Sequence, residues 1–461
     1  MRKLLFALGI GCVLLIAGYF ILQGMVRRKI DATLKTLPDS MTVTYGSLQS
    51  DLFGGRLILT DVRVKDGDRR VSIQRMSLGG LSYFSLAAGR RHISVGHLAL
   101  SGIKLEEGRL LAMEGGLELD SIEVANKDHP MDSLQMGRVA LHADKLTYLV
   151  PGGYEKIRLK GLKLDSRTST LDIDTLQVDP TIDREQVGAR KGRQVDVVEA
   201  GIEGIQIKGL DVMALLRRRL VADVISIRKH RVHVFRDRRL PRVKDRKPMP
   251  VDYLKSLPIA IRVGEVRFGE GSFEYEEFPG KGEKTGMLKI FRLHGTVKAM
   301  TNRPVEGDPA YITVFTEGSL MGSGSVNSTI KMPLHKGVPY HVEGAFHELN
   351  VTKLNPSAEN LGNIHLESGM LNSLAFRFDM DEERATGNIV GEYHDLVVDK
   401  HPLFLIKLII PRDKDHSLPL SKRTGKVDYK HEPDRNFSYY MLHALLVGVK
   451  SSFSLGFLLP G

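Results

Sequence analysis

The chain has 461 residues, of which 42% are hydrophobic and 26% charged, and it contains one cysteine and no tryptophan. A chain of this length and ordinary apolar content folds into several domains or one extended architecture, and global disorder is excluded. A lone Cys12 excludes an internal disulfide framework and any cysteine-based zinc or iron–sulfur site. The formal net charge of +11 makes nucleic acid and anionic lipid the partner classes to weigh.

Residues 4–22 form an apolar run of 19 residues without a charge. At ~1.5 Å per residue a helix of this length spans ~29 Å, about the thickness of the hydrocarbon core of a bilayer. A cleavable signal peptide is the alternative, but its apolar run is shorter and ends in small residues, which residues 19–23 (YFILQ) lack. We therefore predict an uncleaved single-pass anchor within residues 1–29. The flanking basic residues leave its orientation open.

After residue 40 the apolar residues repeat with the spacing Φ-x-Φ-x-x-Φ-x-Φ, where Φ is apolar. The first instance is Leu57, Leu59, Val62 and Val64, and the spacing recurs in residues 71–78, 93–105, 117–124, 157–164, 171–178 and 261–268. On a helix these positions form no single stripe. On strands each pair alternates, and the two-residue spacer inserts one extra residue, as a bulge or corner does, so the next pair returns to the same face. Charged residues fill the positions between, which predicts strands with one apolar and one charged face.

The remaining segments give fewer signals. Residues 374–398 are expected to form a hairpin that turns at 381–387, and residues 211–220 a short amphipathic helix. The basic, proline-containing stretch 238–250 is the best candidate boundary between two halves. The expected division is therefore an anchor (1–29), two β-rich halves (30–240 and 241–435) and an apolar capping or interfacial helix (436–461).

One-sided strands allow two mainly β architectures. A sandwich or barrel would hide every apolar face inside a closed core. The alternative is an elongated, curled, antiparallel-rich sheet whose apolar face lines a groove. Such a groove suits a lipid tail, because moving 16 methylenes into water costs ~12 kcal/mol at about 0.8 kcal/mol each. The strand pattern alone leaves both architectures open.

Motifs at both ends of the chain carry a family resemblance. Residues 43–48 (VTYGSL), 52–57 (LFGGRL) and 59–64 (LTDVRV) follow the anchor, and residues 387–398 (GNIVGEYHDLVV) contain a G-x-x-x-x-x-Y-x-D-L strand. With GKVDY at 425–429 and FSYY at 437–440, this layout resembles the AsmA-like family of Gram-negative envelope proteins, the TamB-related lipid transporters. The resemblance implies an inner-membrane anchor, a periplasmic β-groove and movement of phospholipid towards the outer membrane. It also implies the periplasmic orientation that the charges leave open.

A groove of this kind would be lined by inward-facing apolar residues. The residues expected there are Leu57, Leu59, Val62, Val64, Leu98, Leu100, Leu117, Leu119, Ile261 and Val263. The partners expected are phospholipid, the inner membrane through residues 4–22, and an outer-membrane or periplasmic protein.

A basic cluster supplies most of the excess charge, with 13 Lys or Arg against three Asp between residues 217 and 247. Nucleic-acid binding would call for interleaved aromatic residues or a groove-reading helix, and neither is evident, so no nucleic acid is expected. A solvated strand face with a basic linker remains one interpretation, and contact with anionic headgroups, lipopolysaccharide or an acidic partner the other. The residues concerned are Arg217, Arg218, Arg219, Arg228, Lys229, Arg231, Arg236, Arg238 and Arg239.

Enzyme motifs are missing from the sequence. The His-Glu pairs at 347–348 and 431–432 lack the second histidine of a helical zinc site, and the run 322–325 (GSGS) has turn chemistry only. The acidic run 379–383 lacks the glycine and glutamate of a calcium loop. We therefore expect a non-enzymatic lipid conduit without a metal or cofactor. The alternatives are a scaffold that assists outer-membrane protein assembly and a closed structural β-domain.

Overall fold

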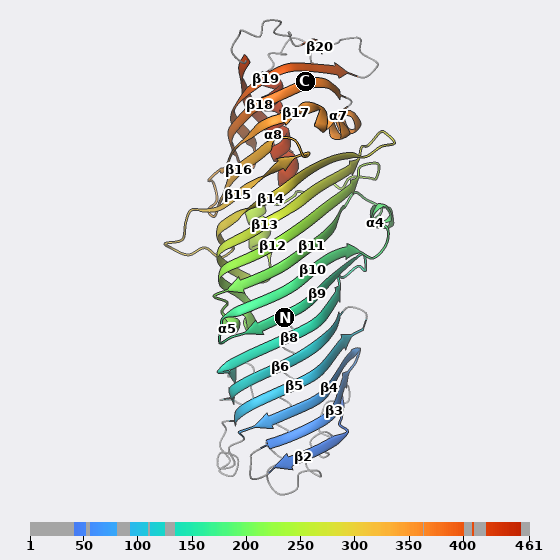
Figure 1. Ribbon diagram of the computed structural model, residues 1–461, viewed down its shortest axis with the longest axis vertical. Helices are drawn as coiled ribbons and strands as arrows, with labels where there is room; N and C mark the ends of the chain where they lie inside the picture. Colours follow the sequence, from blue (N-terminus) through green and yellow to red (C-terminus); the bar gives the residue numbers. More distant parts are fainter. Residues whose placement is uncertain are drawn as a thin grey trace. The chain divides into compact units, whose positions relative to one another are not determined.

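The computed structural model describes residues 41–51, 56–80, 93–108, 111–124, 134–362, 364–400, 408–409 and 421–452. These residues form one large, mostly antiparallel sheet with a few short helices, which confirms the expected β class (Figure 1). The anchor predicted at residues 4–22 lies outside the described residues. Among the described residues, no helix has both the length and the apolar character needed to cross a membrane.

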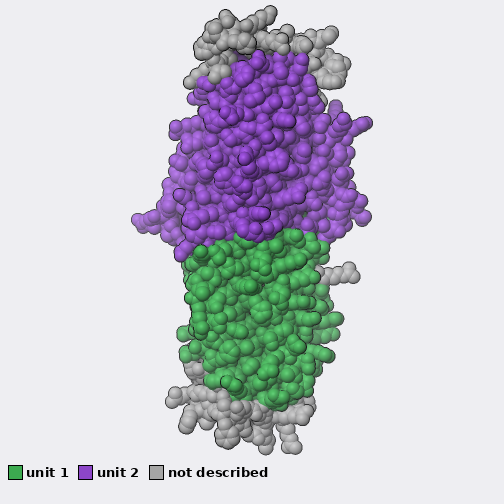
Figure 2. Space-filling view, in the orientation of Figure 1, with its two compact units in different colours: residues 1–177, 204–222 green, residues 178–203, 223–461 purple. Residues whose placement is uncertain are grey.

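The chain divides into two compact units (Figure 2). Unit 1 comprises Met1–Gln177 and Gly204–Ala222, and unit 2 comprises Val178–Glu203 and Asp223–Gly461. The division passes through three strands, β10 (Thr170–Pro180), β11 (Asp196–Lys208) and β12 (Arg219–Asp237). The stretch 238–250, expected to separate two halves, therefore lies inside unit 2.

Unit 1 begins with a run of antiparallel strands. β3 pairs with β1, β2 and β4, and the run continues through β5, β6, β8 and β9, with the short β7 against β6. Their bounds are β1 (Met41–Thr44), β2 (Ser47–Asp51), β3 (Arg56–Asp66), β4 (Arg69–Gly79), β5 (Ile93–Glu107), β6 (Leu111–Val124), β7 (Leu134–Gln135), β8 (Arg138–Leu149) and β9 (Glu155–Asp165).

The helix predicted at residues 211–220 is present but shorter. It is α5 (Val212–Leu216), and the Asp211 carboxylate caps it by accepting a hydrogen bond from Ala214 N at 2.8 Å. Arg218 has a φ of 60°, in the left-handed region, and Arg219 already begins β12. The turn at Arg218 therefore ends the helix before the apolar pattern does.

The predicted corners are present at four of the two-residue spacers. Asp61, Gly102, Ser121 and Gly161 have φ values of 51°, 62°, 52° and 64°. Between β3 and β4 the register passes the corner without a shift, whereas between β5 and β6 it shifts between Leu100 and Ile103. The spacer therefore acts as a corner in β3 and is accompanied by a true bulge in β5.

Unit 2 contains a second antiparallel run, from β13 to β19 with β20 and β21 against β19. Its strands are β13 (Ala260–Phe278), β14 (Gly286–Thr301), β15 (Tyr311–Leu320), β16 (Ser325–Pro333), β17 (Tyr340–Asn350), β18 (Ile364–Met380), β19 (Arg384–Lys400), β20 (Leu408–Ile409) and β21 (Ser421–Lys430). The predicted hairpin is β18–β19, and its turn occupies only residues 381–383 because Arg384 already pairs with Lys430.

The connection from β12 to β13 is a crossover. Glycines of β13 lie against β12 in parallel order, with Gly264 near Asp223, Gly269 near Arg228 and Gly271 near His230. Parallel neighbours need a long connection, and residues 238–259, including α6 (Pro250–Ser256), provide it. The stretch expected as a boundary thus joins the two antiparallel runs.

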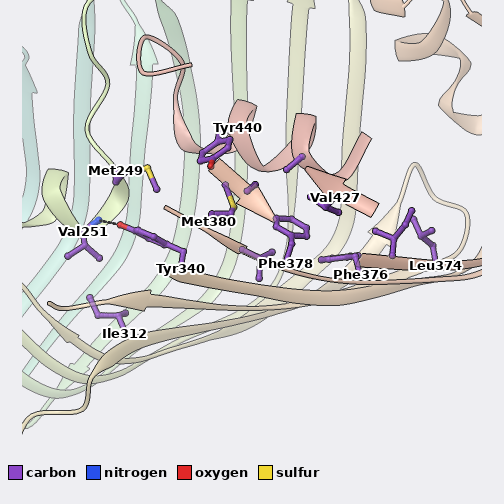
Figure 3. Packing of buried hydrophobic residues seen from close by; sticks show 14 of the residues in the cluster. Met249, Val251, Ile312, Tyr340, Leu374, Phe376, Phe378, Met380, Val427 and Tyr440 are labelled. Atoms are coloured by element: carbon purple, nitrogen blue, oxygen red, sulfur yellow. Dashed lines mark hydrogen bonds between the residues drawn. The ribbon is translucent and has the colours of Figure 1, made fainter. Parts of the chain in front are cut away.

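Helices cover parts of unit 2. They are α4 (Arg184–Lys191), α6, the 3₁₀ helix η1 (Val351–Leu354), α7 (Asn355–Gly362) and α8 (Phe437–Ser452). α8 packs on β21 and β19, and Figure 3 shows Tyr440 beside Met380 and Phe378. Met249 and Val251 join this core from the crossover, and Val251 N donates a hydrogen bond to the Tyr340 hydroxyl at 3.3 Å. The C-terminal helix is therefore a capping helix over the described residues 437–452.

Candidate functional site

The apolar residues of unit 1 form rows across its strands. One row, read from the register, runs Val64, Val71, Leu105, Met113, Leu146 and Leu159. Exposure rises along this row, from 3% at Val64 to 7% at Met113, and Leu146 and Leu159 are only half-buried. Along this row the apolar face is thus closed at β3–β6 and accessible at β8–β9, although Val139, Ala143 and Leu164, outside the row on β8 and β9, are buried.

The structure places the expected lining residues of unit 1 on one face of that unit, and it leaves most of the expected lining residues of both units almost no accessible surface. Those of β3, β5 and β6 are at most 8% exposed: Leu57, Leu59, Val62, Val64, Leu98, Leu100, Leu117 and Leu119. Val263 is 1% exposed and Ile261 is half-buried. A ligand could contact the eight residues of β3–β6 only if this part of unit 1 opened. The strand register is consistent with one common face for these eight residues, and their burial indicates that they pack the core of unit 1.

Unit 2 also has a row of apolar residues that is buried at one end and half-buried at the other, but here the half-buried residues come first in the chain. Its register aligns Val266, Val297, Val314, Ile330, Val342, Phe378 and, after Gly387, Val427. The first four are half-buried, whereas Val342, Phe378 and Val427 lie in the core beneath α8. Along this row the apolar side chains of unit 2 are therefore half-buried at β13–β16 and buried from β17 onwards, whereas Val263 of β13 and Ile312 of β15, outside the row, are fully buried.

Two accessible apolar surfaces result, one in each unit. Strip 1 is the half-buried set on β8 and β9, and strip 2 is the half-buried set on β13–β16. Strip 1 comprises Leu146, Tyr148, Ile157 and Leu159, and strip 2 comprises Val266, Val297, Val314 and Ile330. On the charged face of unit 1, the exposed Lys145 of β8 lies opposite the exposed Lys160 of β9 in the strand register.

Small residues form the row next to strip 2. Phe268 lies opposite Gly295, and Phe376 lies opposite Gly344, so each ring covers a glycine of the neighbouring strand. Between them, the hydroxyls of Thr316 and Ser328 hydrogen-bond at 2.8 Å. The middle of this row therefore consists of small residues, and an aromatic ring lies at each end. The spacing of apolar residues in the sequence does not predict this arrangement.

Part of the predicted basic cluster is neutralised within unit 2. Arg236 makes two hydrogen bonds to the Asp196 carboxylate, at 2.6 and 2.7 Å. Arg238 pairs with Glu277 at 3.0 Å. Such paired guanidinium groups have little capacity left for an external anion.

Two more arginines of the cluster are also paired. Arg239 pairs with Asp237 at 2.8 Å and lies over the Phe278 ring, while Arg228 pairs with Glu203 at 3.2 Å. The Arg239 guanidinium lowers the pKa of Asp237 by hydrogen bonding to it. These contacts bind the end of β12 to its neighbours.

The other basic residues are exposed. Arg217, Arg218 and Arg219 occupy the turn after α5, and within the described part of the chain none of them forms an ion pair. Lys229 and Arg231 are exposed on β12. The arginine turn, residues 217–219, is thus the part of the predicted cluster where three charges available to a partner are consecutive, and Lys229 and Arg231 offer two more.

A half-buried polar cluster in unit 2 was not predicted from the sequence. His233 Nδ1 lies 2.9 Å from Glu199 and Nε2 lies 3.1 Å from Glu276, and ligand atoms of His233, Glu274 and Glu276 all lie within 4.8 Å of one another. This donor set has the chemistry of a divalent-metal site. It is assembled from β11, β12 and β13, so no local motif marks it in the sequence.

Two cations already occupy the carboxylates of this cluster. Arg184 reaches Glu276 at 3.0 Å, and Lys289 reaches Glu274 at 2.9 Å. Burial is the largest single effect and raises the pKa of Glu274. The hydrogen bond and charge of Lys289, together with the charges of His233 and Arg231, outweigh burial and leave that pKa below its usual value. The cluster therefore acts as an ion-pair network that joins α4 to the sheet.

No family model matches this sequence, and no curated protein matches it. The functional assignment consequently rests on the residues themselves, on the strips and on the charges beside them.

Proposed function

We propose that this protein is a membrane-anchored lipid-transfer conduit that shields phospholipid acyl chains along the apolar face of its sheet. The observation that carries the proposal is the pair of apolar strips. Each strip continues a row of core residues but keeps its side chains half-exposed, and charged side chains occupy the opposite face. Val297 and Ile330 of strip 2 also pack against the core cluster, and the part of each side chain that stays accessible is what we assign to the tail.

The energetics favour an acyl chain as the occupant. Each methylene removed from water contributes about 0.8 kcal/mol, so even partial cover of a 16-carbon tail recovers several of its ~12 kcal/mol. Rows of Leu, Ile and Val offer no hydrogen bonds that would fix one position. A tail can therefore slide along such a face without crossing large barriers.

The resemblance to AsmA-like proteins supplies the cellular setting of the proposal. Residues 4–22 would anchor the chain in the inner membrane, and the bulk of the chain would lie in the periplasm. The sheet would form an elongated, curled groove that carries phospholipid towards the outer membrane. The buried residues of β3–β6 would line it only in an opened state, whereas strip 1 and strip 2 are each accessible within their own unit.

The arginine turn is the proposed contact for anionic headgroups. Three consecutive exposed arginines attract phosphate groups, and within the described residues they have no carboxylate to satisfy them. The paired residues Arg236, Arg238 and Arg239 are not part of this contact. Replacing all three arginines of the turn with Gln should slow delivery of anionic lipid more than zwitterionic lipid.

The test combines co-purification with vesicle transfer. The full-length protein, purified in a maltoside detergent, should carry phospholipid detectable by mass spectrometry. A double variant, Leu146→Asp with Leu159→Asp, should lose bound lipid and transfer between vesicles, because two carboxylates would desolvate against a tail. The matched control, Lys145→Asp with Lys160→Asp, changes the same two strands on the charged face and should keep both.

Transfer that survives the Leu146 and Leu159 double variant with the fold intact would refute the conduit. Sensitivity at the strand edges or the basic stretch instead, with no lipid bound, would favour the assembly scaffold.

A further inference from the structure

Two hydroxyl groups lie in the middle of the small-residue row beside strip 2. Thr316 Oγ1 and Ser328 Oγ lie 2.8 Å apart, and both residues are half-buried, so the pair is not sealed in the core. All residues of the row belong to unit 2. Across β13–β18 the strand register carries the row through Phe268, Gly295, Thr316, Ser328, Gly344 and Phe376.

The hydroxyl pair has one more hydrogen-bond donor than it uses. Each hydroxyl has one O–H, and when the two bond to each other one donates and the other accepts. The accepting hydroxyl keeps its own proton. Within the described part of the chain, neither Thr316 nor Ser328 makes a further side-chain hydrogen bond. One O–H is therefore left for water or for a ligand.

The neighbours of the pair on this face are apolar side chains and glycine. Val314 and Ile330 of strip 2 lie on one side, and Gly318 and Val326 lie on the other. At ~3.3 Å per residue along a strand, the hydroxyls lie ~7 Å from strip 2. A tail that covers strip 2 and this row would therefore displace water from the pair. An O–H that loses water without gaining an acceptor costs free energy, so the occupant itself has to supply the acceptor.

The surroundings favour a neutral acceptor over a charged one. An ionised carboxylate would need a cation when water is displaced, because burying an unpaired charge is costly. No residue of the row, of strip 2 or of the Gly318 and Val326 pair is charged. The ester carbonyl at the head of an acyl chain is neutral, accepts hydrogen bonds and brings no donor of its own. It matches one spare O–H on an apolar face.

We infer that Thr316 and Ser328 form a subsite for the ester carbonyl of an acyl lipid whose tail lies along strip 2. The inference rests on the proposed conduit and adds to it a preference for ester-linked over ether-linked lipid. An ether-linked tail has no carbonyl, so it covers the pair without accepting the spare O–H through such a group.

The experiment is a competition between two phosphatidylcholines that share the headgroup and the tail lengths. One has ester-linked tails and the other ether-linked tails. The full-length protein in maltoside detergent receives an equimolar mixture, and mass spectrometry gives the ratio of the lipids that it retains. It should retain the diester about fivefold over the diether, as expected for one neutral hydrogen bond.

A pair of double variants assigns this preference to the hydroxyls. Thr316→Val with Ser328→Ala removes both hydroxyls with little change in shape and should retain the two lipids equally. The matched control, Thr313→Val with Thr329→Val, removes two hydroxyls from the same strands on the charged face and should keep the fivefold preference. Because the measurement is a ratio, it separates this preference from a change in the total amount of lipid bound.

The outcomes separate the subsite from the conduit. Equal retention of the two lipids by the unmodified protein, or a preference that persists without both hydroxyls, overturns the subsite and leaves the conduit standing. An unmodified protein that retains neither lipid refutes the conduit, and the subsite with it.

Infrared spectroscopy tests the contact itself. The diester lipid, isotope-labelled at its carbonyls, should show a carbonyl band at lower frequency on the unmodified protein than on Thr316→Val with Ser328→Ala, because a hydrogen bond weakens the C=O bond. The same band position on both proteins would also overturn the inference.

Discussion

Residues of the same type have different roles in this sheet according to their exposure. Leu98 and Leu159 both lie on the apolar face of unit 1, yet Leu98 is 1% exposed and Leu159 is half-buried. The alternation in the sequence predicts the face of each residue. It could not predict exposure, because exposure depends on what lies over the face rather than on the strand itself.

This difference in exposure predicts that alanine substitutions at Leu98 and Leu159 lower the free energy of unfolding by different amounts. Leu98→Ala should lower the free energy of unfolding by about 2–5 kcal/mol, since it removes fully buried methyl groups and leaves a cavity. Leu159→Ala should cost less than half as much. Denaturant unfolding of the full-length protein in detergent measures both, and equal costs would contradict the distinction between core and strip.

A second residue-scale prediction concerns acid. Hydrogen bonding to Arg262, at 2.6 Å, lowers the pKa of Asp308 to about 2. An acid whose folded pKa is depressed contributes stability above its unfolded pKa of 3.8 and loses it as pH falls towards about 2. Asp308→Asn should therefore flatten the fall in melting temperature between about pH 4 and pH 2. Parallel curves for the two proteins would rule out this role for the pair.

At the scale of elements, the spacing of apolar residues predicted strands and corners well. Asp61 shows why, because a left-handed residue rotates the chain so that Leu59 and Val62 share a face. The bulge of β5 could not be located in the same way, since a register shift depends on the partner strand. The length of α5 was overestimated because Arg218 ends it within an amphipathic pattern.

The corner at Asp61 can be tested by substitution. Asp61→Gly should keep or slightly raise stability, since glycine adopts positive φ freely. Asp61→Val should cost about 1–2 kcal/mol, because a β-branched residue is strained there. Thermal unfolding compares the two, and a harmless Asp61→Val would argue against a left-handed corner.

The docking of α8 gives a further prediction. A Cβ on Gly448 would lie 2.8 Å from Val427 Cγ2, so Gly448→Leu should lift the helix from β21 at a cost of about 1–3 kcal/mol or more. Leu446→Ala, on the exposed side, should change stability little. Hydrogen exchange of the β21 amides should accelerate only in the Gly448 variant. Unchanged protection would mean that α8 does not cap this strand.

At the scale of the whole molecule, the sequence predicted a one-sided sheet but not where its apolar face is accessible. Along the row from Val64 to Leu159 in unit 1 exposure increases from β3 towards β9, and along the row from Val266 to Val427 in unit 2 it decreases from β13 towards β21. The polar cluster around His233 and the hydroxyl pair of Thr316 and Ser328 were not predicted, because each joins residues of different strands. Local patterns determine strands, whereas sites depend on which strands become neighbours.

The central claim, that the strips contact acyl chains, is tested most directly by photocrosslinking. A photoreactive amino acid is placed in turn at neighbouring positions of one strand, and the membrane-bound protein is irradiated in the presence of phospholipid. The pairs are Leu159 with Lys160, Val297 with Lys298, and Val314 with Phe315.

The third pair is the sharpest, because Phe315 is itself apolar and 40% exposed but lies on the other face. The account predicts lipid adducts at Leu159, Val297 and Val314 and none at their neighbours. Adducts at both members of each pair, or only at Phe315, would contradict it.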